Sequence, residues 1–300
     1  GYLAQRLSKS HGIDTEFVYP QIDEWEDAFW QTLKHQDAPF AGISVVAQFL
    51  LYQKIAKYGV KVVLGGQGGD EAFLGYRKFQ LFYLRELAAK KNWLKASSFL
   101  MSLSTMLWAE RARLGLFWKI RARYTGAQST TSMLLSNETV SASPGYNGDI
   151  YQRQIDDVLQ YSLPTLLRYE DRNSMAHSLE SRLPFMDYRL MELACALPVA
   201  MKLHNGYGKW VIRDLMKDKM PDEIRLARYK RGFDVAQERA VVASLMPSIH
   251  NNIKKKQDAY QRFYPNIALG EYFSAASLKQ FPQRITELTT LLWLGSQHAG

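Results

Sequence analysis

Asp70 and Glu71 follow a run of glycines at the end of an apolar stretch, and these are the residues whose types and spacing most readily suggest chemistry. The stretch from Val60 reads VKVVLGGQGGDE, so β-forming residues lead into two glycine pairs separated by Gln67. Glycines let a ligand approach the backbone, and carboxylates are the hard oxygen ligands that Mg²⁺ prefers when it bridges phosphates. The pattern predicts either a phosphate and magnesium site or two acids that simply complement a helix dipole.

This glycine turn matches neither of the two familiar phosphate-binding loops. No Lys-Ser or Lys-Thr pair follows its last glycine, as a Walker A loop requires, and a dinucleotide fingerprint needs a third glycine in register. In an open α/β sheet, ligands bind in the crevice beyond the carboxyl ends of the strands. The expectation of a ligand here therefore rests on the place of the turn after a strand, and not on a motif.

A second segment, residues 163–187 (LPTLLRYEDRNSMAHSLESRLPFMD), places many charges among apolar residues. Such charges are costly to bury unless they pair with one another or contact a polar ligand. The segment therefore predicts either a structural ion-pair network or part of a ligand site. His177 has no second His or Cys at ligand spacing, so it is expected to be a hydrogen-bonded core histidine and not a metal ligand. The charged residues and His177 are, in order, Arg168, Glu170, Asp171, Arg172, His177, Glu180, Arg182 and Asp187.

A third segment, residues 225–233 (RLARYKRGF), carries Lys230 just before a Gly-Phe pair. This lysine could belong to an exposed basic loop, or it could neutralise a phosphate or an oxyanion. Composition alone does not decide between the two.

The elements that must position these segments alternate first and then become helical. Strands are predicted at 15–19 and 60–64, and helices at 23–35 and 43–58. This β-α-β order implies a parallel sheet with right-handed crossovers. Beyond Glu71 the sequence is mainly amphipathic and helical. The Ser-, Thr- and Gly-rich stretch at 126–149 is predicted to be a mobile loop, either an active-site lid or a linker.

Composition excludes several classes of protein. The 300 residues are 47% hydrophobic and 22% charged, which is typical of a soluble globular chain. A single cysteine, Cys195, cannot form an internal disulfide, and no signal peptide is evident, so a cytoplasmic location is expected. The net charge of +9 is spread over small groups without a nucleic-acid-binding pattern, which favours a solvated surface. The uncharged run at 96–109 is too short for a bilayer span and predicts a buried helix, with an interfacial helix as the alternative.

Taken in order, the three segments resemble the synthetase domain of glutamine-hydrolysing asparagine synthetase. That family carries patterns like SGEGADE-x-F-x-GY, LRYDDRNSMAHSVESRVPFLD and Lys-x-Gly-Phe. This chain has LGGQGGDEAFLGY at 64–76, LRYEDRNSMAHSLESRLPFMD at 167–187 and KRGF at 230–233. The stretch NGYGKWVIR at 205–213 agrees as well, and the resemblance covers about residues 1–235.

The resemblance implies that ATP and Mg²⁺ are bound, that the side-chain carboxylate of aspartate is activated as an acyl-adenylate, and that ammonia displaces AMP. In the parent chain a glutaminase domain would supply the ammonia. Gly65 and Gly66 align with the Ser-Gly pair that holds the nucleoside. Asp70 aligns with the ligand of Mg²⁺ and pyrophosphate, and Lys230 aligns with the cation that steadies charge on the adenylate. The resemblance also implies that four further residues shape the site: Glu71, Arg172, Glu180 and Arg182.

Three departures from the family pattern matter. Gln67 stands where the family has a Glu associated with forming the acyl-adenylate, and a neutral amide can hydrogen-bond but cannot act as a base at pH 7. Gly65 replaces a Ser, which removes one hydroxyl from the nucleoside contact. The family's Ser-Gly-Gly-x-Asp-Ser pyrophosphate loop and the leading Cys of a glutaminase domain are absent from these residues. We therefore expect a C-terminal fragment that neither hydrolyses glutamine nor binds ATP tightly.

The fold class predicted by the resemblance is α/β, namely the later part of an ATP-pyrophosphatase parallel sheet, of the adenine nucleotide alpha hydrolase type, with a large helical portion. The sheet part is expected at about 1–80, the helical part at 81–235, and a helical tail at 236–300 packed on the same domain. The predicted function is ATP-dependent amide formation on aspartate. Alternatives are amidation or cyclisation of another carboxylate, as in β-lactam formation or sugar or peptide tailoring, or a non-catalytic nucleotide-binding module. No nucleic-acid or membrane partner is expected, and a homodimer is left open.

Overall fold

The computed structural model describes residues 2–109, 130–131, 139–140, 148–227, 238–258, 260, 273 and 284–297. In the first part of the chain its elements are α1 (Tyr2–His11), α2 (Ile22–His35), α3 (Ser44–Ala56), β1 (Val62–Leu64), α4 (Gly69–Ala72), α5 (Arg77–Ala89), α6 (Trp93–Ala109), β2 (Thr130–Thr131) and β3 (Thr139–Val140). Further along are α8 (Ile150–Asp156), the π-helical turn η2 (Asp157–Tyr161), α9 (Leu163–Met175), β4 (Glu180–Arg182), the 3₁₀ turn η3 (Pro184–Met186), α10 (Tyr188–Ala196), α11 (Val199–Lys202), α12 (Trp210–Leu215), α13 (Asp222–Arg225), α14 (Glu238–Lys255) and α18 (Arg284–Gln297).

A small parallel sheet joins the first two sequence segments. β1 pairs with β4 so that Leu64 lies opposite Arg182. The pairing continues beyond the strand ends, because the Gly65 N–H donates to the Arg182 carbonyl and the Glu180 N–H donates to the Lys61 carbonyl, each at 2.8 Å. The expectation of an α/β fold with a parallel sheet is confirmed at this level, and most of the described residues are helical.

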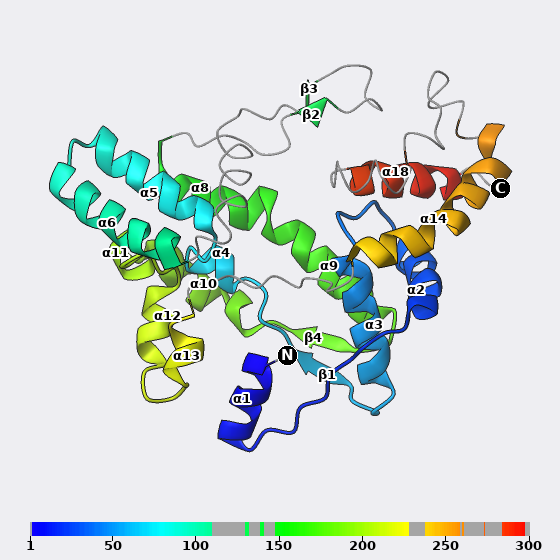
Figure 1. The fold of residues 1–300 in the computed structure, drawn as a ribbon, viewed down its shortest axis with the longest axis horizontal. Helices are drawn as coiled ribbons and strands as arrows, with labels where there is room; N and C mark the ends of the chain where they lie inside the picture. The colour runs from blue at the N-terminus through cyan, green and yellow to red at the C-terminus, as the bar shows by residue number, and fades with distance from the viewer. Residues whose placement is uncertain are drawn as a thin grey trace.

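The larger hydrophobic core lies among α2, α3 and the two C-terminal helices α14 and α18, on the right of Figure 1. Its apolar positions recur at helical spacing along α2, so that Ala28, Phe29 and Leu33 are buried on one side. Two hydrogen bonds join the distant segments: Trp30 Nε1 donates to Ser248 Oγ at 2.9 Å, and Thr289 Oγ1 donates to the Phe40 carbonyl at 2.9 Å. The C-terminal helices and α2 are therefore parts of one core.

A second core forms between α5 and α6, which make a helical hairpin at the left of Figure 1. α5 contributes Phe82 and Leu87, and α6 contributes Ala96, Phe99 and Leu103, which recur at helical spacing along one side of that helix. The hairpin projects from the body of the molecule in Figure 1, so that one side of α6 faces α5 and another faces away from it.

Several expectations from the sequence differ from the structure. Residues 15–19, predicted as a strand, are extended but pair with no strand in the described part of the chain. The helix predicted at 43–58 ends at Ala56. Most of the stretch 126–149 lies outside the described residues, although β2 and β3 within it pair antiparallel. Among the helices that the structure describes, none is both long and apolar enough to cross a membrane.

Candidate functional site

The glycine turn leaves the end of β1 with one glycine packed closely and the next one open. A methyl group at residue 65 would lie 2.6 Å from Leu183 Cδ2 and 3.0 Å from Glu170 Oε1, whereas one at residue 66 would meet nothing within 4 Å. Gly66 is also exposed. A ligand could thus approach the backbone at Gly66, while Gly65 is required by its neighbours from the second segment.

The rest of the turn packs against the same segment. Gly68 has a φ of +88°, a left-handed conformation that favours glycine, and a methyl group there would lie 2.8 Å from Met186 Sδ. A methyl group at Gly69 would come within 3.2 Å of the Phe185 ring. Gln67, between these glycines, is half-buried. The first two sequence segments therefore converge at one place in the fold.

Asp70, in the first turn of α4, forms an ion pair with Lys209. The Lys209 Nζ lies 2.7 Å from Asp70 Oδ1, and both side chains remain partly exposed. Two further contacts hold this pair in place. The Lys209 N–H donates to the Phe73 carbonyl at 3.0 Å, and the Asp70 carboxylate packs on Gly75, in the space that a side chain at that position would occupy. An ammonium and a carboxylate thus stand together beside the glycine turn.

Glu71 points into the protein instead of toward the turn. It is almost fully buried and accepts hydrogen bonds from Ser162 Oγ, at 2.9 Å, and from the Tyr76 hydroxyl. Burial, together with the negative charge of Glu71, raises the pKa of Tyr76, so this hydroxyl stays protonated. Because its oxygens are engaged inside the fold, Glu71 is placed to anchor α4 and not to reach a ligand.

A buried ion cluster lies next to Glu71. Asp157 accepts from Arg153 Nη2 at 2.9 Å and pairs with Lys78, and all three side chains are buried. Burial lowers the pKa of Lys78, and the carboxylate of Asp157 opposes that shift. The cluster connects α5 with α8 and η2, so it fixes the helical layer behind the turn.

Glu170 is the centre of a second buried polar group, on the other side of Gly65. Its carboxylate accepts from Ser181 Oγ at 2.9 Å, from the Tyr52 hydroxyl and from the Gln48 side-chain amide. Burial and the hydrogen bond to Glu170 raise the pKa of Tyr52. With three donors around it, the carboxylate is held firmly in place beside the glycine turn.

The three residues of the second segment that the resemblance implied to shape the site are exposed: Arg172, Glu180 and Arg182. Glu180 and Arg182 form an ion pair with each other at 2.8 Å, and their backbone, not their side chains, holds β1. They share a sheet face with Val62 and Leu64, and Leu64 is 73% exposed. Arg172 pairs instead with Asp37 at 3.3 Å in the loop that follows α2.

The third segment is described only as far as residue 227, so Lys230 lies outside the described residues. Its first residue is nevertheless linked to the site. The Arg225 carbonyl accepts from Arg213, and Arg213 Nε donates to the Gly208 carbonyl at 2.9 Å. Gly208 in turn packs directly on the backbone of Leu74, next to the Asp70 and Lys209 pair.

The described acids could hold a magnesium ion only together with oxygen ligands from a substrate. Among the described residues, no group of three or more His, Cys, Asp or Glu could hold a metal ion. Mg²⁺ is, however, commonly held by one or two carboxylates together with substrate phosphates. Asp70, partly exposed and directly after the glycine turn, is suited to that arrangement, whereas the buried Glu71 is not.

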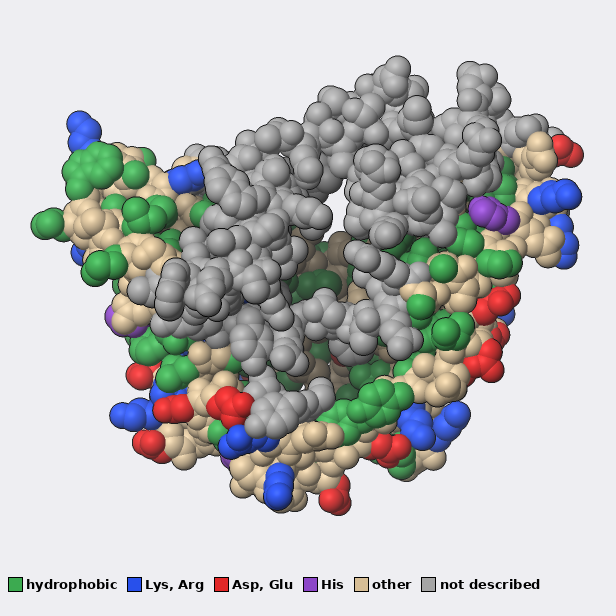
Figure 2. All heavy atoms as spheres, in the orientation of Figure 1, with side chains coloured by type: hydrophobic (Ala, Val, Ile, Leu, Met, Phe, Trp, Pro, Cys, Tyr) green, Lys and Arg blue, Asp and Glu red, His purple; other side chains and the backbone are tan. Residues whose placement is uncertain are grey.

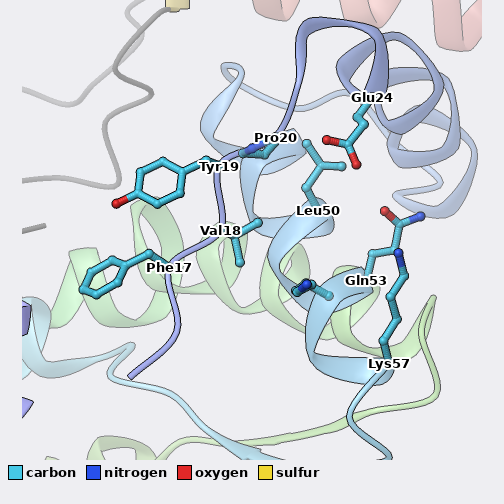
Figure 3. Close-up of a pocket in the computed structure, with 9 residues that line it drawn as sticks. Phe17, Val18, Tyr19, Pro20, Glu24, Leu50, Gln53 and Lys57 are labelled. Atoms are coloured by element: carbon cyan, nitrogen blue, oxygen red, sulfur yellow. The ribbon is translucent and has the colours of Figure 1, made fainter. Parts of the chain in front are cut away.

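A separate hollow lies on another side of α3 and does not involve the glycine turn. Figure 3 shows it between residues 17–20 and α3. Its volume is about 170 Å³. Lys57 and Gln53 line it, together with Glu24 from α2. Tyr52, on the same helix, instead reaches Glu170. The hollow is therefore not part of the candidate site.

Lys209 and Tyr52 are the residues near the site that sequence reasoning missed. Lys209 lies in the NGYGKWVIR stretch that had supported the resemblance, and it adopts a left-handed φ of 56° after two glycines. The two glycines that precede Lys209 were the one feature of the sequence that could have indicated its special position. Nothing in the spacing of Tyr52 from Glu170 could have indicated their contact.

Comparisons with known proteins agree with the arrangement of these segments. A family model described as asparagine synthase matches residues 2–295. The chain is 25% identical over 284 residues to glutamine-hydrolyzing asparagine synthetase 1 of Bacillus subtilis (strain 168), an alignment that covers 86% of this chain and 44% of the relative. It is 28% identical over 181 residues to asparagine synthetase 3 of the same organism, covering 60% and 27%. The amidase chyE of Penicillium rubens is 23% identical over 269 residues, covering 74% and 39%. The chain spans less than half the length of these relatives.

Proposed function

The chain belongs to the asparagine synthase family, and from this premise we propose that it provides part of the site at which a carboxylate is activated with ATP and converted to an amide. One observation carries the proposal: the glycine turn that leaves β1 contains an exposed, open Gly66 and is followed directly by Asp70, whose carboxylate has a lysine ammonium 2.7 Å away. The open glycine gives access to a nucleotide, the ammonium suits the charged phosphates, and the carboxylate suits a magnesium ion that accompanies them.

The proposed reaction has two steps. An oxygen of the substrate carboxylate attacks the α-phosphorus of ATP, and pyrophosphate leaves. Ammonia then attacks the acyl carbon, and AMP leaves as the amide forms. Both steps gather negative charge on phosphate oxygens, and cationic groups in a site shielded from water stabilise that charge.

Each residue of the candidate site would have a separate role in binding the nucleotide or in neutralising its charge. The backbone at Gly65 and Gly66 would border the nucleoside, and Asp70 would hold a magnesium ion that neutralises phosphate charge. Lys209 would orient the Asp70 carboxylate and place a positive charge beside the phosphates. Gln67 would donate a hydrogen bond and could not take a proton, and Lys230 is proposed to act on the adenylate as the family pattern implies.

Aspartate is the first substrate candidate, because the named relatives from Bacillus subtilis are asparagine synthetases. A different carboxylate is the second, and two departures favour it: Gln67 and Gly65 replace the Glu and Ser of the family pattern. These two positions flank Gly66, where the nucleotide is proposed to bind, so a different substrate or a different orientation of it would require different residues there. Ammonia would come from a glutaminase domain of the parent protein.

The exposed sheet face supports the further proposal that the chain is part of a longer protein. Parallel sheets are normally covered on both faces, and their strands are apolar for that reason. In β1, Leu64 is 73% exposed and Val62 is exposed as well. We expect upstream strands carrying a Ser-Gly-Gly-x-Asp-Ser loop to pair with β1. Hydrogen exchange at the Val62 and Leu64 amides should slow when upstream residues are present, and unchanged exchange would contradict the expectation.

The test of function is amino-acid-dependent exchange of labelled pyrophosphate into ATP, measured on the protein from the whole reading frame. Exchange with aspartate supports the first candidate, and exchange with another carboxylate supports the second. Absence of exchange with any carboxylate would overturn the enzymatic proposal and leave a nucleotide-binding module. The variant Asp70→Asn should lower exchange at least about tenfold, whereas the matched control Asp214→Asn, which changes an exposed acid on α12, should retain it.

A further inference from the structure

The helix α6 carries apolar residues on two sides, and only one of them is covered. Ala96, Phe99 and Leu103 pack into the core with α5. On another side, Trp93 and Leu94 are 65% and 87% exposed, and Leu100 and Met101, two turns further on, are 54% and 68% exposed. We call these four residues the α6 patch. A helix that is apolar around most of its circumference is normally covered by something.

Figure 2 shows hydrophobic side chains gathered at the end of the molecule where α5 and α6 lie, and Figure 1 shows that this hairpin projects away from the main body. Scattered exposed apolar side chains are ordinary on protein surfaces, but a contiguous group on a projecting element marks an interaction surface. The prediction from sequence that residues 96–109 form a buried helix is therefore only half correct.

The polar groups of this surface are compatible with an apolar environment. Two exposed serines at or next to the patch bond to carbonyls of their own helix: Ser97 Oγ donates to the Leu94 carbonyl at 3.0 Å, and Ser104 Oγ donates to the Met101 carbonyl at 2.7 Å. A hydroxyl satisfied in this way can be taken out of water at little cost.

The charges around the patch are of one dominant sign. Lys90, Lys91 and Lys95 are exposed at the end of the hairpin where the patch begins. α6 itself contains no acidic residue from Trp93 to Ala109. Lys90 pairs with Glu86 on α5, and the lysines that follow lie at the turn and on the first turn of α6. A basic rim beside an apolar helical face complements a surface that is anionic outside and apolar beneath.

We infer that the α6 patch docks on the surface of a lipid bilayer carrying anionic headgroups, with α6 lying in the plane of the interface. Trp93 would lie at headgroup depth, the position that tryptophan favours, while Leu94, Leu100 and Met101 would enter the acyl boundary. No described helix is long and apolar enough to span a bilayer, which agrees with surface docking. This inference is an alternative to the expectation from sequence that the protein has no membrane partner, and it is independent of the proposed function.

The test is co-flotation of the full chain with vesicles of phosphatidylcholine, with and without phosphatidylglycerol. The wild type should bind the anionic vesicles and lose affinity as salt rises. The double variant Leu94→Gln and Met101→Gln should bind at least about tenfold more weakly. A control, Leu215→Gln, changes a leucine on α12 that is 59% exposed, and should bind like the wild type.

The lysines provide a second, independent readout. Lys91→Gln with Lys95→Gln should weaken binding to anionic vesicles by about fivefold per lysine and leave binding to neutral vesicles unchanged. All variants change exposed side chains, so circular dichroism and unfolding midpoints should match the wild type. The inference is overturned if the wild type does not float, or if the patch variant floats as well as the wild type. It is also overturned if the patch variant changes only self-association, which would make the occupant a second copy of the chain.

Discussion

Replacing Gly65 with alanine should destabilise the fold, because the space beside its backbone is already occupied. The added methyl group would lie 2.6 Å from Leu183 Cδ2 and 3.0 Å from Glu170 Oε1. Carbon atoms pack best at about 3.5–4.0 Å, so the overlap with Leu183 is about 1 Å. Leu183 is half-buried and its end can turn, but three hydrogen bonds hold the Glu170 carboxylate in place.

The expected size of the effect follows from two opposing terms. Overpacking of this kind costs about 1–3 kcal/mol. A glycine-to-alanine change also restricts the unfolded chain, which favours folding by about 0.4–1 kcal/mol. Gly65→Ala should therefore lower the free energy of unfolding by about 1–2 kcal/mol. Gly66→Ala is the matched control: its methyl group would meet nothing within 4 Å, so it should be neutral or slightly stabilising.

Urea unfolding followed by circular dichroism measures the difference, and with ordinary slopes it corresponds to a midpoint shift of about 0.5–1 M between the two variants. A double-mutant cycle identifies the obstacle. Leu183→Val, the residue of the family pattern, removes the methyl group that overlaps, so the double variant should recover about 1 kcal/mol relative to the sum of the single changes. Equal midpoints for the two alanine variants, or strictly additive effects with Leu183→Val, would refute the steric explanation.

Three further predictions concern the neighbouring polar groups. Glu71→Ala removes the carboxylate that accepts from two partly buried hydroxyls and should cost about 1–3 kcal/mol of stability by urea unfolding, with Glu71→Gln costing less; an unchanged midpoint would contradict the anchoring role. Asp70→Asn and Lys209→Met should each lower pyrophosphate exchange at least about tenfold while changing stability by less than about 1 kcal/mol, since the pair is partly exposed. Burial lowers the pKa of Lys202 from 10.5 to about 8, so between these pH values the unfolded chain holds a proton that the folded chain lacks. The free energy of unfolding of the wild type, relative to that of Lys202→Met, should therefore rise with pH by about 1–3 kcal/mol across that window. A difference that does not change with pH would show that the lysine is not titrating there.

The sequence could predict the turn and the helices that flank it, because their signals are local. A run of β-formers entering glycines before two acids defines the turn at 65–71, and the apolar spacing defines α2 and α3 within a few residues. The same reasoning could not find β4. Its three residues, Glu180 to Arg182, have poor strand propensity, and they are extended because their backbone pairs with β1.

The contacts that complete the site could not be predicted from local sequence patterns either, because they join residues that are far apart in the sequence. Lys209 reaches Asp70 only after the chain has formed the helical layer between them. Tyr52 meets Glu170 because α3 and α9 pack together. Sequence reasoning named Arg172 as a site-shaping residue beside Glu170, yet the two side chains leave α9 in different directions, one to Asp37 and one toward Gly65. Neighbours in a helix point to different surroundings, so a charged block alone does not say which charges meet a ligand.

The composition of the two paired strands indicates where the glycine turn would lie in a larger sheet. β4 presents Glu180 and Arg182 on the face where β1 presents Val62 and Leu64. Charged side chains are typical of an edge strand, and continuous apolar residues are typical of a strand covered on both faces. The hydrogen bonds at Lys61 and Gly65 both run to β4, so the backbone groups of residues 62 and 64 point to the opposite edge of β1. A further strand would therefore pair on that edge and make β1 internal. The turn after it would then stand between neighbouring strand ends, which is the position where open α/β sheets bind their ligands.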